Sequence, residues 1–475
     1  MNKTERSVAW YIWGSPERAD MLGVPADSHM DLPARQPQTE PITPGTRRGI
    51  ISNSPLEPEP GSMHMQVLDR VSKQGFRINS RFMDLLFSWW GPRPPLNQNL
   101  ASDYRSLGAN KGKVIFTDAF FDWRLRVYTM AGTWGSLQNS RLSRAALEAP
   151  YAVAPTPEQW AEVVAVFKHE DWPTTYADAS EYLKTPSTDW MQIRAALAVL
   201  EYHETGQTAY LVEQDASCSG FQHVALLMRD PDLARQVNAT ITDSRNDLYA
   251  YVADICGIGP ALGLNDREAR QWAKPVVMLT GYGSGAGGIA CRYWFDAGGA
   301  GEYNEDGEFE PKEGQTVTIG ARTLNFQELK DLVKPMQKAL FNEFPVLKHL
   351  RAQCMSYFQE CMDADPTQFV WTTPLGGQCV RYITPSEQAA GGVSEAGAMP
   401  NLVHSIDACV VQQVVLDWDH VLGVVHDAFF TTADRVGQLK KCVRDAYRKV
   451  HSDLGEFPVG RRKAAPLPIG TCIGI

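Results

Sequence analysis

Apolar residues spaced three and four positions apart predict helices along much of the chain. The pattern becomes continuous at Met63 and runs to about Trp90. Further helical segments are predicted at 157–202, 220–230, 243–258, 266–282, 327–363 and 396–420. Helices therefore dominate the expected structure.

Two short apolar stretches have the length and the polar ends that are typical of buried strands. The first runs from Ala209 to Val212 and leads to Asp215, while 421–433 predicts a strand, a turn and a strand with Asp427 at the tip. Residues 301–316 are acidic and rich in turn-forming residues, so we expect a solvated hairpin there. The pattern as a whole predicts a helix-rich α+β chain.

The composition is that of an ordinary globular protein. Of 475 residues, 44% are hydrophobic and 21% are charged, which excludes a wholly disordered, collagen-like or coiled-coil chain. The N-terminal part differs, because prolines recur from about residue 24 to 62 and large apolar residues are scarce. We interpret residues 1–62 as an extended arm rather than a domain.

The charge balance narrows the possible partners. Lys and Arg total 45 against 55 Asp and Glu, a formal net charge of −10. This excludes a globally basic nucleic-acid coat but permits a local basic cleft on an acidic body.

The nine cysteines indicate reduced thiols, because their number is odd and none forms a Cys-x-x-Cys pair. The N-terminus has neither the apolar region of a signal peptide nor the acid-poor composition of a mitochondrial transit peptide. The densest apolar stretch, Val410 to Val425, is interrupted by polar and charged residues and is no membrane span. We therefore expect a cytoplasmic protein without membrane partners.

Two aspartates have settings that suggest chemistry. Asp215 follows one predicted strand, and Asp427 lies at the tip of a hairpin between two others. Carboxylates on neighbouring strands can share two Mg²⁺ ions, which assist an in-line phosphoryl displacement. Considered alone, each aspartate could instead have a structural role and cap a turn.

A cationic pair lies on the predicted helix 266–282. Arg270 and Lys274 are four residues apart, so a helix places them on one face, with Tyr282 near its end. Two cations so placed could hold a triphosphate, and the aromatic ring could meet the sugar. Pro275 should kink this helix or mark its start. By themselves the two cations could also be a solvated helix surface.

In this order the three elements resemble polymerase motifs A, B and C of the single-subunit RNA polymerases of T-odd bacteriophages, mitochondria and chloroplasts. The segment Asp215 to His223 matches D-G-S-C-S-G-x-Q-H with one change, and His426 to Phe429 resembles H-D-S-F. Motif B, R-x-x-x-K-x-x-x-M-x-x-x-Y-G-S, is matched in full by 270–284. Three further segments resemble family signatures, namely 122–128 (D-W-R-G-R-x-Y), 371–376 (W-x-T-P-x-G) and 400–405 (P-N-x-x-H-S).

The resemblance implies catalytic and nucleotide-binding roles. Asp215 and Asp427, with the backbone carbonyl of Ala216, would bind two Mg²⁺ ions. Arg270 and Lys274 would hold the phosphates, and Lys274 could protonate the leaving pyrophosphate. The remaining nucleotide contacts would come from Tyr282, which would sense the 2′-hydroxyl, and from His404 and Tyr249.

The resemblance also implies contacts with the template and the product. These would come from Arg124, Arg126, Gly283, Ser284 and His426. Three of the residues named above could instead have a purely structural role. Arg126 could pair with Asp122 and merely stabilise the fold, and His404 and Tyr249 could be core residues. Ala216 replaces a glycine, a change that we expect to be tolerated because only its backbone is needed.

The resemblance implies a right-hand polymerase architecture. We assign 63–205 to a reduced N-terminal or thumb-like region, 206–234 to the palm with motif A, 235–345 to the fingers, and 346–475 to the palm with motif C and the C-terminal segment. The chain has no room for the family's promoter-binding domain, and 377–400 is too short for its specificity hairpin. This suggests a shortened, phage-type member.

The expected function is DNA-directed RNA synthesis from ribonucleoside triphosphates on single-stranded or partner-opened DNA, with an accessory phage protein or a single-stranded-DNA-binding protein as a candidate partner. Two alternatives remain open. One is a primase-like enzyme or a family A DNA polymerase, although the motif A glutamate that blocks a 2′-hydroxyl is missing. The other is a catalytically inert nucleic-acid-binding relative.

Overall fold

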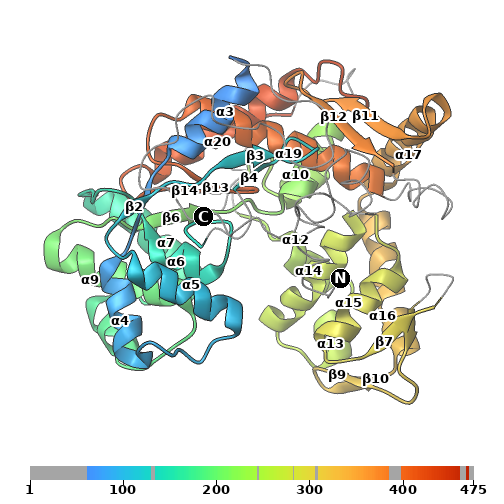
Figure 1. Ribbon diagram of the computed structural model, residues 1–475. Helices are drawn as coiled ribbons and strands as arrows, with labels where there is room; N and C mark the ends of the chain where they lie inside the picture. Colours follow the sequence, from blue (N-terminus) through green and yellow to red (C-terminus); the bar gives the residue numbers. More distant parts are fainter. Residues whose placement is uncertain are drawn as a thin grey trace, which may run out of the picture.

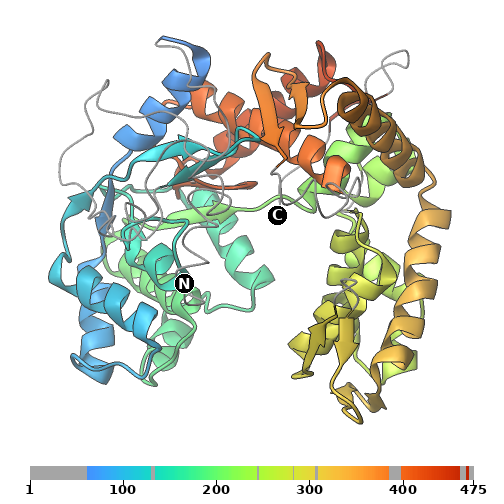
Figure 2. The same cartoon turned by 45° about the vertical axis from the view of Figure 1, so that its right-hand side comes forward.

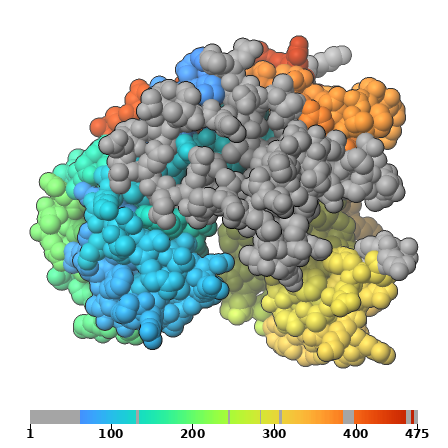
Figure 3. All heavy atoms as spheres, in the orientation of Figure 1, coloured from blue at the N-terminus to red at the C-terminus, as the bar shows by residue number. Residues whose placement is uncertain are grey.

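The computed structural model describes residues 61–129, 134–242, 245–281, 283–304, 309–383, 397–460 and 467–469. The predicted proline-rich arm lies almost wholly outside these residues. Two lobes hang from a common upper part, and Figure 1 and Figure 2 agree in keeping the lobes apart. In the space-filling view of Figure 3 they form separate masses on either side of the midline. The helix-rich α+β class and the right-hand arrangement are as predicted.

A three-stranded antiparallel sheet in the upper part carries the two aspartates. Its strands are β6 (Leu211–Gln214), β13 (Gly423–Val425) and β14 (Ala428–Thr432), in the order β13-β14-β6. Phe429 of β14 pairs with Gln214 of β6. Asp215, one residue after β6, therefore lies beside the β13–β14 turn that contains Asp427.

Helices and small hairpins complete the upper part around one large hydrophobic core. The core joins segments from both ends of the described part of the chain, such as Leu68 and Phe457, which are both fully buried. The elements are α3 (Met63–Lys73), β3 (Ala119–Phe121), β4 (Val127–Thr129), α10 (Ser219–Met228), α11 (Pro231–Gln236), α17 (Val346–Ala364), β11 (Gln368–Thr372), β12 (Gln378–Tyr382), α19 (Ala398–Asp417) and α20 (Val436–Ser452).

The left lobe in Figure 1 comes from the N-terminal third of the described chain. A small sheet in the order β2-β1-β5 ties it together. Its elements are β1 (Phe76–Ile78), α4 (Ser80–Trp90), α5 (Gln98–Ala109), β2 (Val114–Ile115), α6 (Arg141–Ala146), β5 (Leu147–Glu148), α7 (Pro157–His169), α8 (Tyr176–Tyr182) and α9 (Trp190–Thr205).

The right lobe in Figure 1 is mainly helical, with two hairpins at its lower end. The predicted hairpin within 301–316 is confirmed by β7 (Gly301–Tyr303) and β8 (Phe309–Pro311), and a second hairpin follows it. The other elements are α12 (Leu248–Ile255), α13 (Ile258–Leu262), α14 (Asp266–Gly281), α15 (Ala286–Asp296), β9 (Val317–Ile319), β10 (Arg322–Leu324) and α16 (Phe326–Glu343).

Two predicted helices are in fact interrupted. The segment 63–90 forms α3 and α4 with β1 between them, and a methyl group at Gly75 before that strand would lie 2.7 Å from Phe116. The predicted helix 327–363 breaks between α16 and α17 at Phe344, because Pro345 disfavours helical backbone in the residue before it. Pro275, in contrast, lies within α14 and does not mark its start.

Candidate active site

A pocket of about 760 Å³ lies where the two lobes meet the central sheet. Nine of the residues predicted from the sequence line it: Arg126, Asp215, Ala216, Tyr249, Arg270, Lys274, His404, His426 and Asp427. Its wall carries six Arg and Lys against four Asp and Glu, the reverse of the balance in the whole chain. The expected basic cleft in an acidic body is therefore present.

Burial and neighbouring carboxylates raise the pKa of both aspartates in the pocket. Asp215 is open to the pocket, yet the surrounding walls desolvate it, and this together with the charge of Asp427 raises its pKa to about 7. Burial and then the charge of Asp407 raise the pKa of Asp427, while a hydrogen bond with Ser219 opposes the shift. Crowded carboxylates of this kind are stabilised by a cation placed between them.

The residues present fit Mg²⁺, which uses few protein ligands and keeps positions for water and phosphate. The carbonyl of Ala216 accepts a hydrogen bond from the N–H of Cys218 at 2.9 Å and retains a second lone pair. Ala216 has an ordinary negative φ, so its backbone has no need of glycine. No cluster of three or more His, Cys, Asp or Glu side chains suited to a metal occurs among the described residues.

The cationic pair on α14 faces one aromatic ring. The Arg270 guanidinium lies 5.4 Å and the Lys274 ammonium 5.5 Å from the ring centre of Tyr249 on α12. The prediction that both cations share one helix face is confirmed, because α14 continues through Pro275. Both side chains point to the pocket that also holds the carboxylates.

A residue that sequence reasoning did not assign holds Arg270 in place. Asp247 accepts a hydrogen bond from Nε of Arg270 at 2.6 Å through one carboxylate oxygen. Its other oxygen accepts the backbone N–H groups of Tyr249 and Ala250, and so caps α12. Burial would raise the pKa of Asp247, but these hydrogen bonds keep it below the usual range. Asp247 is therefore an ionised carboxylate that links Arg270 to the start of α12.

The two arginines predicted to contact the template, Arg124 and Arg126, form ion pairs with different carboxylates. The Arg124 side chain, not that of Arg126, pairs with Asp122, at 2.6 Å. Arg126 instead pairs at 2.7 Å with Asp407 on α19. Burial would lower the pKa of Arg126, but Asp407 raises it above the ordinary value. The suggested pairing of Arg126 with Asp122 was wrong for the side chain, since Asp122 accepts only its backbone N–H.

The two predicted histidines both face the pocket. His426 has a φ of 55° in the β13–β14 turn, an uncommon backbone for a residue other than glycine. Its ring lies edge-on to Tyr128 at 5.2 Å, and its Nδ1 atom is buried without a hydrogen-bond partner among the described residues. His404 is within 3.4 Å of Arg124. Burial, then the charges of Arg126 and Arg124, hold the pKa of His404 well below its usual range.

Some predicted site residues are not brought into the pocket. Arg124, Gly283 and Ser284 do not line it, and Tyr282 lies outside the described residues. The carbonyl of Ser284 accepts a hydrogen bond from Gln337 on α16 at 2.7 Å. Gly283, with a φ of 81°, lies in the turn that follows α14.

The motif segments that lie apart in the chain pack against each other. The Trp371 indole donates a hydrogen bond to Ser405 at 2.9 Å and meets the Trp123 ring edge-on at 5.8 Å. Gln412 on α19 donates to the carbonyl of Leu125, which has a φ of 62° where the family pattern has glycine. The segments 122–128 and 371–376 and the helix α19 thus pack into one assembly.

Sequence reasoning missed several pocket residues. Glu213 lies two residues before Asp215, on the same face of β6, so strand periodicity could have found it. Arg245 lies four residues before Tyr249. Arg141 and Arg144 on α6 had no signal, because nothing in the local sequence tells that α6 faces the central sheet. All four line the pocket.

The cysteines and the hydrophobicity of the helices agree with the sequence where the structure describes them. The eight cysteines among them are free, in agreement with reduced thiols; Cys472 lies outside. No helix in the described ranges combines the length and the apolar character that crossing a bilayer requires.

Comparisons with known proteins agree with the motifs. The family model described as DNA-dependent RNA polymerase matches residues 187–456, more than half of the chain. The chain is 25% identical to the mitochondrial DNA-directed RNA polymerase of Schizosaccharomyces pombe over 293 residues, 53% of this chain and 24% of that protein. The mitochondrial DNA-directed RNA polymerases of Mus musculus and Homo sapiens are 26% and 25% identical over 52% and 54% of this chain, and over 22% and 23% of their own lengths.

These matches span about a quarter of the length of the curated relatives. Among solved structures, the chain resembles the POL domain of Pol1 from M. smegmatis in complex with DNA primer-template and dNTP, with a TM-score of 0.38 and 13% identity. The likeness covers 87% of this chain and 68% of that one.

Proposed function

Because this chain belongs to the DNA-dependent RNA polymerase family, we propose that it synthesises RNA on a DNA template by nucleotidyl transfer. One observation carries the proposal: a single pocket contains two crowded carboxylates, Asp215 and Asp427, and a pair of cations on α14. Nucleotidyl transfer needs this combination, because it requires charge stabilisation and alignment of phosphates more than covalent help from the protein.

In the proposed reaction, Arg270 and Lys274 bind the triphosphate of the incoming ribonucleotide. The 3′-hydroxyl oxygen of the growing RNA forms a bond to the α-phosphorus, its proton goes to solvent, and the bond to the β-phosphate breaks. Lys274 neutralises or protonates the leaving pyrophosphate. Asp215, Asp427 and the Ala216 carbonyl would hold two Mg²⁺ ions, which when bound supply Lewis acidity for this exchange.

The remaining predicted residues would hold the sugar and the nucleic acids. His404 and Tyr249 would flank the nucleotide, His426 would contact the RNA end, and Arg124 and Arg126 would approach the template. Gly283 and Ser284 would touch the template from the end of α14, and Tyr282 would sense the 2′-hydroxyl.

We also propose that the template is single-stranded or opened by an accessory phage protein or a single-stranded-DNA-binding protein. Only residues 383–397 join β12 to α19, where relatives with a specificity hairpin would need a longer segment. The same proposal assigns 63–205 to a thumb-like region, 206–234 and 346–475 to the palm, and 235–345 to the fingers.

The test is primer-free nucleotide incorporation on matched single-stranded and duplex DNA, with ribonucleotides or deoxynucleotides and Mg²⁺. We expect RNA synthesis mainly on single-stranded DNA. Asp427→Ala should abolish it, whereas Asp419→Ala, at an exposed ion pair with Arg70, should not. Full activity of Asp427→Ala would disprove the carboxylate centre.

The choice of sugar has its own test. Tyr282→Phe should incorporate deoxynucleotides while it keeps its activity with ribonucleotides. A wild-type protein that prefers deoxynucleotides would instead support a DNA polymerase and contradict the role of Tyr282.

A further inference from the structure

The pocket has a second cationic wall that the sequence analysis did not assign. Arg141 and Arg144 on α6 line the same pocket as Arg270 and Lys274 on α14. Helix α6 belongs to the left lobe and α14 to the right lobe, and both views keep these helices on opposite sides (Figure 1, Figure 2). We call Arg141 and Arg144 the α6 wall.

Arg144 is anchored, and its charge is partly balanced. Its guanidinium lies 3.2 Å from the Glu213 carboxylate and 5.6 Å from the ring centre of Phe430, while its Nε atom donates to the Leu137 carbonyl at 3.2 Å. Burial raises the pKa of Glu213, and both arginines of the α6 wall oppose that shift. Glu213 therefore fixes Arg144 beside the carboxylate pair and leaves part of its charge for another anion.

Arg141 interacts with the Glu213 carboxylate only through its charge and has no ion pair among the described residues. Its side chain is exposed, and within the described part of the chain this side chain makes no hydrogen bond either. It also borders a second cavity of about 460 Å³, which Leu100, Asp189 and Trp190 help to line. An arginine at the junction of two cavities, with its donors unused, is suited to bind phosphate.

The geometry of in-line displacement says which phosphate this is. The attacking oxygen and the leaving group lie on opposite sides of the reacting phosphorus. If the cations of α14 hold the leaving pyrophosphate, the nucleotide that attacks lies on the other side of Asp215 and Asp427. That side is the α6 wall.

We propose that the α6 wall binds the 5′-phosphate groups of the ribonucleotide whose 3′-hydroxyl attacks. This inference rests on the proposed function. The phosphate can come from an initiating nucleoside triphosphate or from the last nucleotide of a longer RNA, and the chemistry of recognition is the same. Such a site would help an enzyme start chains without a primer, because the first nucleotide has no duplex of its own to hold it.

Dinucleotide synthesis on a single-stranded template that specifies G and then A separates the two nucleotides. In Arg141→Gln, the KM for the priming GTP should rise about tenfold, the effect of losing one hydrogen bond to a charged group. The KM for the incoming ATP, and the KM when guanosine primes, should not change. Arg292→Gln, at an exposed ion pair on α15, is the matched control.

Arg144 is tested as a double variant, because its removal alone would leave Glu213 unpaired. Arg144→Gln with Glu213→Gln should likewise weaken priming by GTP but not by guanosine. Extension of a preformed RNA primer distinguishes the sources of phosphate. If primer extension is also impaired, the α6 wall binds the phosphodiester at the RNA end. If extension is normal, the α6 wall binds only the initiating triphosphate.

A binding measurement keeps this inference separate from the proposed function. Calorimetric titration of the full chain with GTP and Mg²⁺ should show two sites, of which Arg141→Gln weakens one and Arg270→Gln the other. Two altered sites in a protein that makes no RNA would refute the proposed function and retain the α6 wall. Unchanged GTP binding in Arg141→Gln and in the double variant, or an equal loss with guanosine, would overturn the α6 wall.

Discussion

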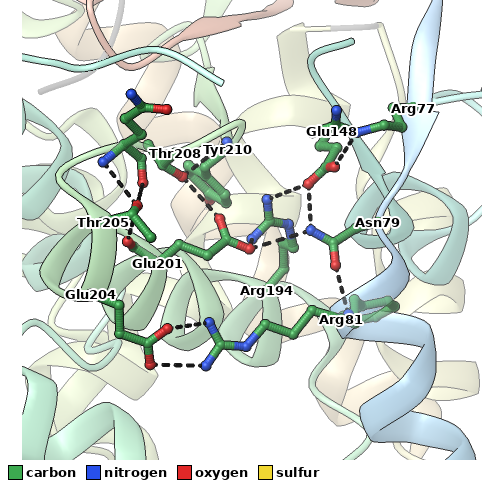
Figure 4. Close-up of polar contacts among 12 residues, drawn as sticks. Arg77, Asn79, Arg81, Glu148, Arg194, Glu201, Glu204, Thr205, Thr208 and Tyr210 are labelled. Atoms are coloured by element: carbon green, nitrogen blue, oxygen red, sulfur yellow. Dashed lines mark hydrogen bonds and ion pairs between the residues drawn. The ribbon is translucent and has the colours of Figure 1, made fainter. Parts of the chain in front are cut away.

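Two regions of this molecule use the same residue types in opposite ways. In the left lobe, Arg194 on α9 is almost fully buried and donates to Glu148 at 3.0 Å and to Glu201 at 3.3 Å. Arg77 and Asn79 complete the hydrogen bonds of Glu148. Figure 4 shows these five residues, which we call the Arg194 cluster, joined into one network.

In the pocket, like charges are instead gathered on the same wall, and they are only partly compensated, as Arg270 is by Asp247. Asp215 and Asp427 crowd each other, and Arg270 lies beside Lys274 over one ring. In the Arg194 cluster two arginines meet two glutamates, so the charges are compensated within the fold. The difference teaches that a charge balanced by its neighbours supports the structure, whereas a charge left unbalanced is available for a ligand.

The largest expected effect separates activity from stability at the pocket. Asp215→Asn removes one of two crowded charges while it keeps the shape of the side chain. Nucleotide incorporation should fall by about 10²–10³-fold or more, the scale seen when a group that stabilises the reacting atoms is lost. The thermal midpoint in EDTA should stay the same or rise, because a repulsion is removed. A clearly lower midpoint would show that Asp215 supports the fold.

The Arg194 cluster should respond in the reverse manner. Glu148→Gln leaves Arg194 as a buried, poorly compensated charge, so the free energy of unfolding should fall by about 3–5 kcal/mol. Incorporation per folded molecule should not change. The exposed Arg81–Glu204 pair, also drawn in Figure 4, is the control, and Glu204→Gln should cost at most about 1 kcal/mol. Equal losses in both variants, measured by denaturant titration, would contradict the comparison.

The sequence predicted the pocket better than it predicted the lobes around it. Motif spacing located Asp215, Asp427, Arg270 and Lys274, because strand ends and i, i+4 spacing are local properties. The break at Phe344 was missed although Pro345 signals it, since the apolar period continues across the proline.

Contacts between distant segments could not be predicted. The pairing of Arg126 with Asp407 joins residues 281 positions apart, and no local pattern gives it. The approach of Arg144 on α6 to Glu213 on β6 also depends on how the left lobe docks on the sheet. Such contacts follow from the packing of whole elements, which periodicity does not encode.

A smaller, pH-dependent effect should arise at a pair of buried histidines and not in the Arg194 cluster. His451 is buried against His223, at 3.0 Å, and His223 in turn faces Asp407 and stacks on Tyr447. Burial and then His223 hold the pKa of His451 well below the usual 6.5. The unfolded chain therefore takes up a proton near pH 6.5 that the folded chain refuses, so stability is lost as the pH falls below that value.

His451→Gln removes this titration and retains a group that can hydrogen-bond to His223. Thermal midpoints measured from pH 7.5 to 5 should therefore fall less steeply in His451→Gln than in the wild type. Glu148→Gln, in a cluster without histidine, should keep the wild-type slope although it lowers the midpoints. Parallel slopes in all three proteins would show that another group governs the acid response.

The smallest effect concerns Asp247, an anion that contacts the cationic pair through Arg270. Asp247→Asn keeps an oxygen that can cap α12 but removes the charge that holds Nε of Arg270. The guanidinium then loses its fixed orientation, so the KM for ribonucleoside triphosphates should rise by up to about tenfold. The thermal midpoint and kcat should stay near their wild-type values, because the cap and the carboxylates are intact. An unchanged KM would mean that Tyr249 alone positions Arg270, and the double variant Asp247→Asn with Tyr249→Leu would then reveal the loss.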